Sequence, residues 1–88
     1  MSSNLNTLFE EAFKKASNTS EKFPPDVLLK LYAYYKQATK GDQFTFNANS
    51  NDDDLRNAFK FNAWMQLKGM NEDEAKQEYI NLVNTIIK

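Results

Sequence analysis

Tyrosine and lysine side chains recur at helical spacing in the stretch from Leu28 to Asp42, which reads LLKLYAYYKQATKGD. Residues three and four apart lie on one face of a helix. One such stripe consists of Leu28, Tyr32, Tyr35 and Lys36. An ammonium group can neutralise phosphate, and tyrosine offers a flat ring for stacking and a hydroxyl donor. The stripe favours a ligand with a base, phosphates and an apolar tail, although periodicity alone also allows tyrosines in the core and a solvated lysine.

The composition excludes several kinds of chemistry. The 88 residues are 41% hydrophobic and 26% charged, which is typical of one soluble globular domain. Neither histidine nor cysteine is present, so disulfides, thiolate metal sites and His- or Cys-based catalysis are excluded. The net charge of -1 gives no general attraction to nucleic acid, and we expect no such partner. No signal-like segment or membrane span is recognisable, so we expect a cytoplasmic protein.

Four segments with helical periodicity must position the stripe. Pro24-Pro25 favours a helix start, Gly41 and Gly69 favour helix ends, and Asn71 with Glu74 resembles a capping box. The expected helices cover residues 4–17, 25–40, 52–68 and 72–87 of a single domain, 1–88. This pattern predicts an all-α fold, a small up-and-down four-helix bundle.

The connection between the second and third expected helices is polar. Residues 43–51 have no helical period, so we expect a long loop. Asp52, Asp53 and Asp54 lack the alternating ligand spacing of a calcium loop, and acidic side chains at a helix start complement the helix dipole. We therefore expect helix capping here, with no metal site and no cofactor.

Two motifs resemble signatures of the acyl-CoA-binding protein family. Tyr32, the YKQAT run at 35–39 and Gly41-Asp42 resemble its YxxYKQATxGD segment. The KFNAW run at 60–64, LKG at 67–69, and an EA pair followed by Tyr79 resemble its KWxAWxxLKG and EAxxxY segments, in the same order. The resemblance extends from about Phe9 to the end of the chain. It implies a skewed four-helix bundle that binds long-chain fatty acyl-CoA without catalysis.

The resemblance also implies roles for five residues. The positions matching Tyr32, Lys36 and Lys60 bind the 3′-phosphate region of the ligand in that family, and those matching Tyr35 and Tyr79 contact adenine and ribose. The residue types suit these roles, because lysines neutralise phosphates and tyrosines stack and donate hydrogen bonds.

An acyl chain also needs an apolar groove. Each buried methylene contributes about 0.8 kcal/mol, so affinity should rise with chain length. The candidates for the groove are Leu28 on the second helix and Phe9, Ala12 and Phe13 on the first. Each of the four could equally belong to the bundle core.

The chain departs from the family pattern in three places. Phe61 stands where the family has tryptophan, and we expect it to serve packing. The connection from Asp42 to Lys60 is longer than usual and lacks the customary Pro-Gly and basic residues, which removes the basis for loop contacts to ligand. Ser17 falls at a position that is basic in the family, and spacing does not decide whether Lys14 or Lys15 substitutes for it.

The function that fits best is a monomeric carrier that buffers long-chain acyl-CoA and delivers it to acyl-CoA-using enzymes. An enzyme would need carboxylates or lysine as catalysts, and no paired acids stand out. A helical protein–protein interaction module without acyl-CoA binding is the stronger alternative, because interfaces also use exposed tyrosines and a residue such as Trp64. Stabilisation by acyl-CoA would distinguish the two.

Overall fold

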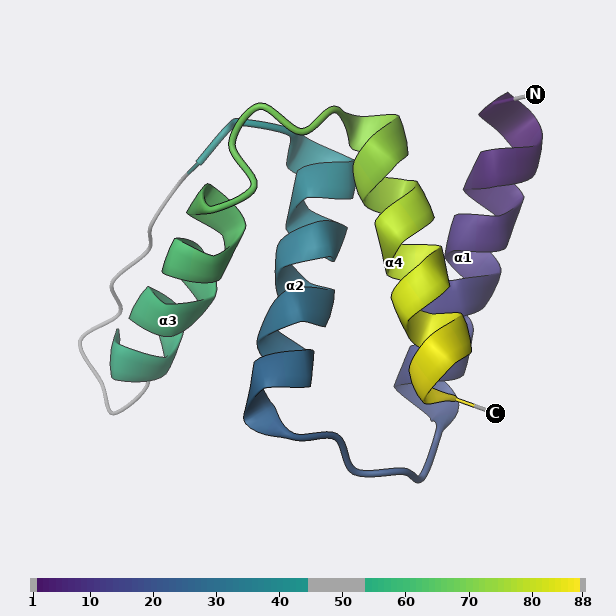
Figure 1. The fold of residues 1–88 in the computed structure, drawn as a ribbon, viewed down its shortest axis with the longest axis horizontal. Coiled ribbons are helices and arrows are strands. Elements are labelled where there is room, and N and C mark those ends of the chain that lie inside the picture. Colours follow the sequence, from purple (N-terminus) through teal and green to yellow (C-terminus); the bar gives the residue numbers. More distant parts are fainter. Residues whose placement is uncertain (1, 45–53, 88) are drawn as a thin grey trace.

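The computed structural model describes residues 2–44 and 54–87, and these residues form helices and no strand. The helices are α1 (Ser2–Asn18), α2 (Pro25–Lys40), α3 (Asp54–Met65) and α4 (Glu72–Ile86), as Figure 1 shows. The predicted all-α class and four-helix bundle are confirmed. The predictions for residues 45–53, which include most of the polar connection, lie outside the described residues.

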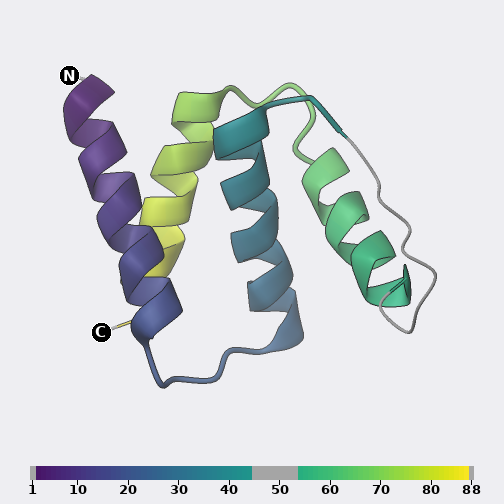
Figure 2. The same cartoon turned by 180° about the vertical axis from the view of Figure 1, so that it is seen from behind.

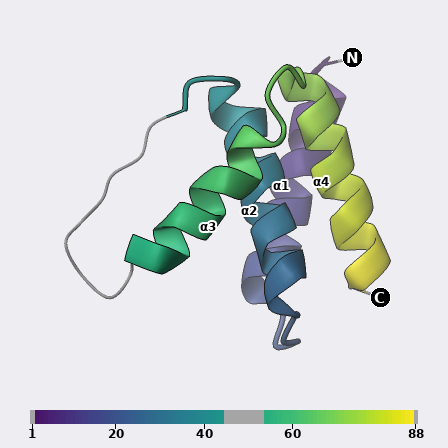
Figure 3. The ribbon, with the colours of Figure 1, turned by 60° about the vertical axis from the view of Figure 1, so that its left-hand side comes forward.

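The helices are arranged around α2 and α4. Helix α4 packs against both α1 and α2, whereas α3 contacts only α2 among the described helices. Figure 2 shows from behind that α4 and α1 lie on one side of α2 and α3 on the other, and in Figure 3 α3 lies to the left of α4. Helices α2 and α3 run in the same direction, so the bundle does not alternate simply up and down (Figure 1).

Local sequence signals account for both ends of α2. Pro25 occupies the first turn, where its missing N–H costs nothing, and the amides of Val27 and Leu28 donate to the Pro24 carbonyl at 3.0 and 3.1 Å. At the other end the Gly41 amide donates to the Gln37 carbonyl, and Gly41 adopts φ 60° and ψ -137°. This conformation suits glycine because it has no Cβ. Its ψ differs from that of the left-handed helical conformation in which many helices end.

Helix α3 ends earlier than the sequence predicts. We expected it to reach Lys68, but it ends at Met65 and continues as a turn over residues 66–69. The Leu67 and Lys68 amides donate to the carbonyls three residues before them, at 3.0 and 3.1 Å. Gly69 has φ 91°, and its amide donates to the Asp42 carboxylate at 3.1 Å. This long-range hydrogen bond accompanies the departure from α-helix, and helical periodicity cannot reveal it.

Helix α4 begins as its capping residues predict. The Asn71 side chain accepts a hydrogen bond from the Glu74 amide at 2.7 Å. Acidic residues Glu72, Asp73 and Glu74 occupy the first turn, where they complement the helix dipole. The first turn of α4 is therefore stabilised by local interactions.

The main core lies between α1, α2 and α4. Its buried members are Phe9, Ala12, Leu31, Ala38, Ala75, Tyr79, Ile80 and Val83. A second cluster forms where α3 meets the end of α2, and here the Phe44 ring lies 4.9 Å from Trp64 and 6.4 Å from Phe61. Phe61 thus packs against aromatic neighbours, as expected of an apolar ring at that position.

A buried hydrogen-bond network joins these two parts of the structure. Gln37 has no exposed surface, and its amide nitrogen donates to Asp42 at 2.8 Å and to the Met70 carbonyl at 2.7 Å. Its amide oxygen accepts from the Trp64 indole at 3.0 Å, and the same indole lies 3.2 Å from the Gly41 carbonyl. We call Gln37, Gly41, Asp42, Trp64 and Met70 the Gln37 network. It fixes the end of α3 and the following turn to the end of α2.

None of the helices in the described ranges is long and apolar enough to cross a membrane. The same residues contain no group of three or more acidic side chains placed to hold a metal ion.

Candidate functional site

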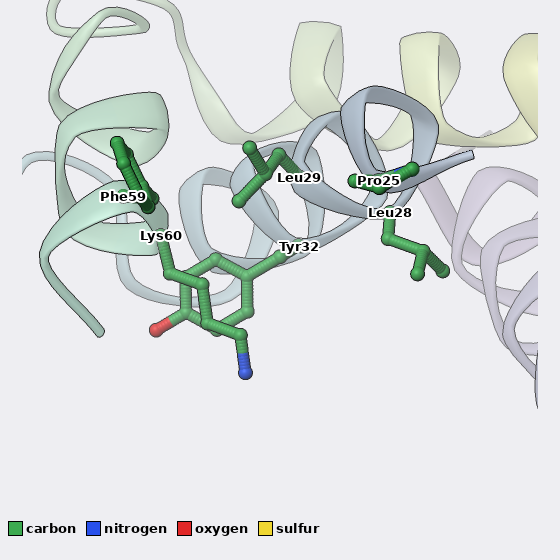
Figure 4. A pocket seen from close by; sticks show the side chains of 6 residues that line it. All are labelled: Pro25, Leu28, Leu29, Tyr32, Phe59 and Lys60. Atoms are coloured by element: carbon green, nitrogen blue, oxygen red, sulfur yellow. The ribbon is translucent and has the colours of Figure 1, made fainter. Parts of the chain in front are cut away.

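A cavity of about 590 Å³ opens between α2 and α3. Its lining comes from Pro25, Leu28, Leu29 and Tyr32 on α2 and from Phe59 and Lys60 on α3 (Figure 4). Phe59 and Leu28 are 55% and 52% exposed, more than any other large apolar side chain in the described residues. Most of the lining is carbon, so this cavity is suited to an apolar ligand group of this size.

Two ammonium groups lie over the aromatic ring at the edge of this cavity. The Lys60 nitrogen is 5.4 Å from the centre of the Tyr32 ring, and the Lys36 nitrogen is 5.7 Å from it. Lys36 also lies 5.6 Å from the Trp64 ring. In Figure 4 the Lys60 side chain runs alongside the Tyr32 ring with its nitrogen pointing away from the helices. Attraction to the ring faces holds both cations in place.

This pair of lysines, which with Tyr32 we call the cationic cluster, is suited to an anion. Within the part of the chain that is described, no carboxylate pairs with either ammonium group. Burial raises the pKa of the Tyr32 phenol, so its hydroxyl stays protonated at neutral pH and can donate a hydrogen bond. Two cations and a hydroxyl donor at one place form a site that a phosphate group could occupy.

Tyr35 and Tyr79 lie in a separate group of rings between α1, α2 and α4. Tyr35 stacks on Phe9 and Phe13, with ring centres 5.9 and 5.0 Å apart, and lies 6.3 Å from Tyr79. Phe9 meets Tyr79 edge to face at 5.2 Å. We call Phe9, Phe13, Tyr35 and Tyr79 the aromatic cluster.

The Tyr79 hydroxyl stands out within the aromatic cluster. Tyr79 is only 3% exposed, and burial together with the nearby Tyr35 raises its pKa to about 12. Its hydroxyl forms no hydrogen bond with another described residue, although buried hydroxyls usually have a partner. A ligand atom at this position would supply the missing partner.

The structure thus divides the five predicted head-group residues into two groups. Tyr32, Lys36 and Lys60 come together in the cationic cluster, and Tyr35 and Tyr79 in the aromatic cluster. Tyr32 and Tyr35 are three residues apart on α2, so their Cα atoms are about 4.5 Å apart along the helix axis.

The expected acyl-groove residues are distributed differently. Leu28 lines the cavity, but Phe9 and Ala12 are 7% and 4% exposed and belong to the core. Phe13 lies on Tyr35 and does not line the cavity. The first helix was named as a groove wall because periodicity shows which residues share a face without showing which neighbour covers it.

Sequence reasoning did not name Pro25, Leu29 or Phe59 as lining residues, although the structure places all three at the cavity. The signal for Phe59 was present, because apolar residues surround the third helix nearly completely. Such a helix must border something apolar on more than one side. Lys14 and Lys15, the two alternatives near the end of α1, are both exposed and do not line the cavity.

Comparison with known proteins gives consistent results. The family model described as "Acyl CoA binding protein" matches residues 6–83. Acyl-CoA-binding protein of Saccharomyces cerevisiae is 39% identical over 83 residues, which cover 94% of this chain and 93% of the relative. Acyl-CoA-binding protein of Dictyostelium discoideum is 38% identical over 79 residues, covering 86% and 88%.

A solved structure agrees at the level of the fold. The crystal structure of Oryza sativa Acyl-CoA-Binding Protein 2 superposes with a TM-score of 0.78 at 30% identity, covering 94% of this chain and 90% of that one. With the four helices, both sequence motifs and these matches, the chain belongs to the acyl-CoA-binding protein family.

Proposed function

We propose that this protein binds long-chain fatty acyl-CoA esters without catalysis, buffers them, and delivers them to enzymes that use them. One observation carries the proposal: an apolar cavity and two ammonium groups that pair with no carboxylate of the described residues share the Tyr32 side chain as a common wall. An acyl-CoA ester has an apolar chain at one end and a phosphate-rich nucleotide at the other. The site offers a matching surface to each end.

The head group is assigned to the two clusters. Lys36 and Lys60 neutralise phosphate charge, and the Tyr32 hydroxyl donates to a phosphate oxygen. Tyr35 and Tyr79 contact the adenine and ribose, where the hydroxyl of the buried Tyr79 gains the hydrogen-bond partner that no described residue gives it. This arrangement places the nucleotide along α2, from the cationic cluster toward the aromatic cluster.

The acyl chain is assigned to the cavity between α2 and α3. Leu28 and Phe59 are the most exposed of the large apolar residues described, and a bound chain would cover them. Each buried methylene contributes about 0.8 kcal/mol, so affinity should rise about fourfold per methylene until the cavity is filled.

The cavity offers few side chains that could act as catalysts. The side chains at the cavity that carry polar atoms are the Lys60 ammonium and the Tyr32 phenol. Because burial raises the pKa of Tyr32, its phenol is a poor general base near neutral pH. A monomer with one site of this kind can hold a thioester out of water without attacking it.

Isothermal titration calorimetry tests the proposal. The protein is titrated with palmitoyl-CoA, palmitate and free coenzyme A in separate experiments. We expect one-to-one binding of the thioester and much weaker binding of either half, because only the thioester uses both the cavity and the cationic cluster. If palmitoyl-CoA gives neither binding nor a rise in melting temperature, the proposal fails and a protein–protein interaction module becomes the better interpretation.

A further inference from the structure

Phe13 is an exposed aromatic residue that the cavity does not explain. It is 41% exposed, whereas Phe9, one turn earlier on α1, is 7% exposed. Its ring lies nearly parallel to that of Tyr35, with 5.0 Å between the ring centres and 27° between the planes. Phe13 therefore extends the aromatic cluster from the core to the surface.

The cluster reaches the surface next to the site proposed for phosphate. Tyr35 directly precedes Lys36 on α2 and lies one turn beyond Tyr32. Because Tyr35 adjoins Lys36 on α2, a nucleotide whose phosphate is held by Lys36 can extend its base toward Tyr35 and the Phe13 ring that stacks on it. Part of the Phe13 ring remains open to solvent and can accept a second flat ring.

From this geometry we infer that Phe13 is a base-stacking residue, which together with Tyr35 forms a platform for the purine of the bound nucleotide. The inference rests on the proposed function and adds a specificity-determining residue to it. It also assigns Phe13 to the head-group end of the ligand, in place of the acyl groove that the sequence suggested. Stacking needs only a flat aromatic surface, so a phenylalanine without polar groups is sufficient.

Packing alone explains the exposed ring less well. A phenylalanine that served only to cover Tyr35 would remove its own surface from water, but Phe13 keeps two-fifths of its surface exposed. Leu8, on the same helix, is exposed to nearly the same extent, 42%. The stacked geometry with Tyr35 is what distinguishes Phe13 from an ordinary exposed apolar side chain.

The test compares two ligands by calorimetry: palmitoyl-CoA, and S-palmitoyl-4′-phosphopantetheine, which has the acyl chain and one phosphate but no nucleoside. Phe13→Leu keeps an apolar side chain on Tyr35 and removes the ring. It should weaken palmitoyl-CoA binding about 5- to 150-fold, the range for losing one base–aromatic stack. The same variant should bind the nucleoside-free ligand as the wild type does. Phe13→Tyr, which keeps a ring, should retain palmitoyl-CoA affinity.

Leu8→Ala is the matched control for loss of exposed apolar surface on α1, and it should change neither affinity. Melting temperatures verify that each variant is folded. An equal loss for both ligands in Phe13→Leu would place Phe13 in the acyl site, and no loss for either would make it a packing residue; each result overturns the inference. If the wild-type protein does not bind palmitoyl-CoA, the proposed function itself fails, which is a different outcome from normal wild-type binding with an unaffected variant.

Discussion

Replacing the buried Gln37 by leucine should destabilise the protein strongly, although Gln37 itself does not line the proposed cavity. Leucine is apolar and of similar size, so the change removes hydrogen bonds while leaving little empty space. The lost bonds are those to Asp42, the Met70 carbonyl and the Trp64 indole, at 2.8, 2.7 and 3.0 Å. Each ordinary hydrogen bond contributes about 0.5–1.5 kcal/mol to stability.

Three such bonds together contribute about 1.5–4.5 kcal/mol, and the partners left behind decide where in this range the loss falls. The Trp64 indole keeps its contact with the Gly41 carbonyl at 3.2 Å, and the exposed Asp42 carboxylate can be hydrated. The half-buried Met70 carbonyl has no other partner among the described residues. We therefore expect a loss of about 2–3 kcal/mol of unfolding free energy. A chain of 88 residues has a total of about 4–13 kcal/mol, so the loss is a large fraction of it.

Urea denaturation followed by tryptophan fluorescence measures this loss directly. Trp64 is the single tryptophan, is 1% exposed, and becomes exposed when α3 separates or the chain unfolds. Gln66→Leu is the matched control, because Gln66 is exposed in the turn after α3 and undergoes the same chemical change. The control should stay within about 0.5 kcal/mol of the wild type. If Gln37→Leu behaves like the control, the Gln37 network does not stabilise the fold and the reasoning is refuted.

Three further predictions concern charge and ionisation. Lys36→Ala and Lys60→Ala should each weaken palmitoyl-CoA binding about 10- to 150-fold in calorimetry, because each removes a charge-assisted contact to phosphate. If both variants keep the wild-type affinity, Lys36 and Lys60 do not bind phosphate. The hydrogen bond from Gln37 holds the pKa of Asp42 below its ordinary 3.8, so the carboxylate stabilises the fold above that pH and loses this effect as the pH falls. The Asp42→Asn variant should accordingly have a lower melting temperature than the wild type at pH 7, and this difference should become smaller below pH 3.8. A difference in melting temperature that does not change with pH would contradict this prediction. Burial raises the pKa of Tyr79 to about 12, so an ultraviolet titration should show one phenol that ionises near pH 12. Because the ordinary pKa is 10.0, the wild type should lose stability between pH 10.0 and 12, and the Tyr79→Phe variant should lack this loss.

Local signals in the sequence account for much of the secondary structure. Pro25 and Gly41 mark the two ends of α2, and Asn71 marks the start of α4, because each acts on its own few residues of backbone. The same signals overestimated α3, since the Gly69 amide is bonded to Asp42, 27 residues earlier. Helical periodicity in the sequence does not reveal interactions between segments that are so far apart.

In the candidate site, too, local sequence signals predicted some features, whereas those that depend on distant segments were missed. Helical spacing indicated Tyr32 and Lys36, the family resemblance added Lys60, and the structure brings these three together. The position of the cavity was not predictable, because helix α2 presents Leu28 to α3, and periodicity does not show which partner each face meets. Gln37 was missed as a buried residue for a related reason: a polar side chain can be buried when distant groups satisfy it.

The isolation of α3 has a consequence for how the molecule opens. Since α3 contacts only α2 among the described helices, it can detach while α1, α2 and α4 keep the main core intact. Amide hydrogens of α3 should therefore exchange with solvent through a local opening, at rates set by less than the global unfolding free energy. A ligand that spans the cavity joins α3 to α2 and must dissociate before that opening, so ligand concentration should slow exchange in α3 more than in α4. Exchange in this one helix would then report the fraction of the protein that carries a ligand.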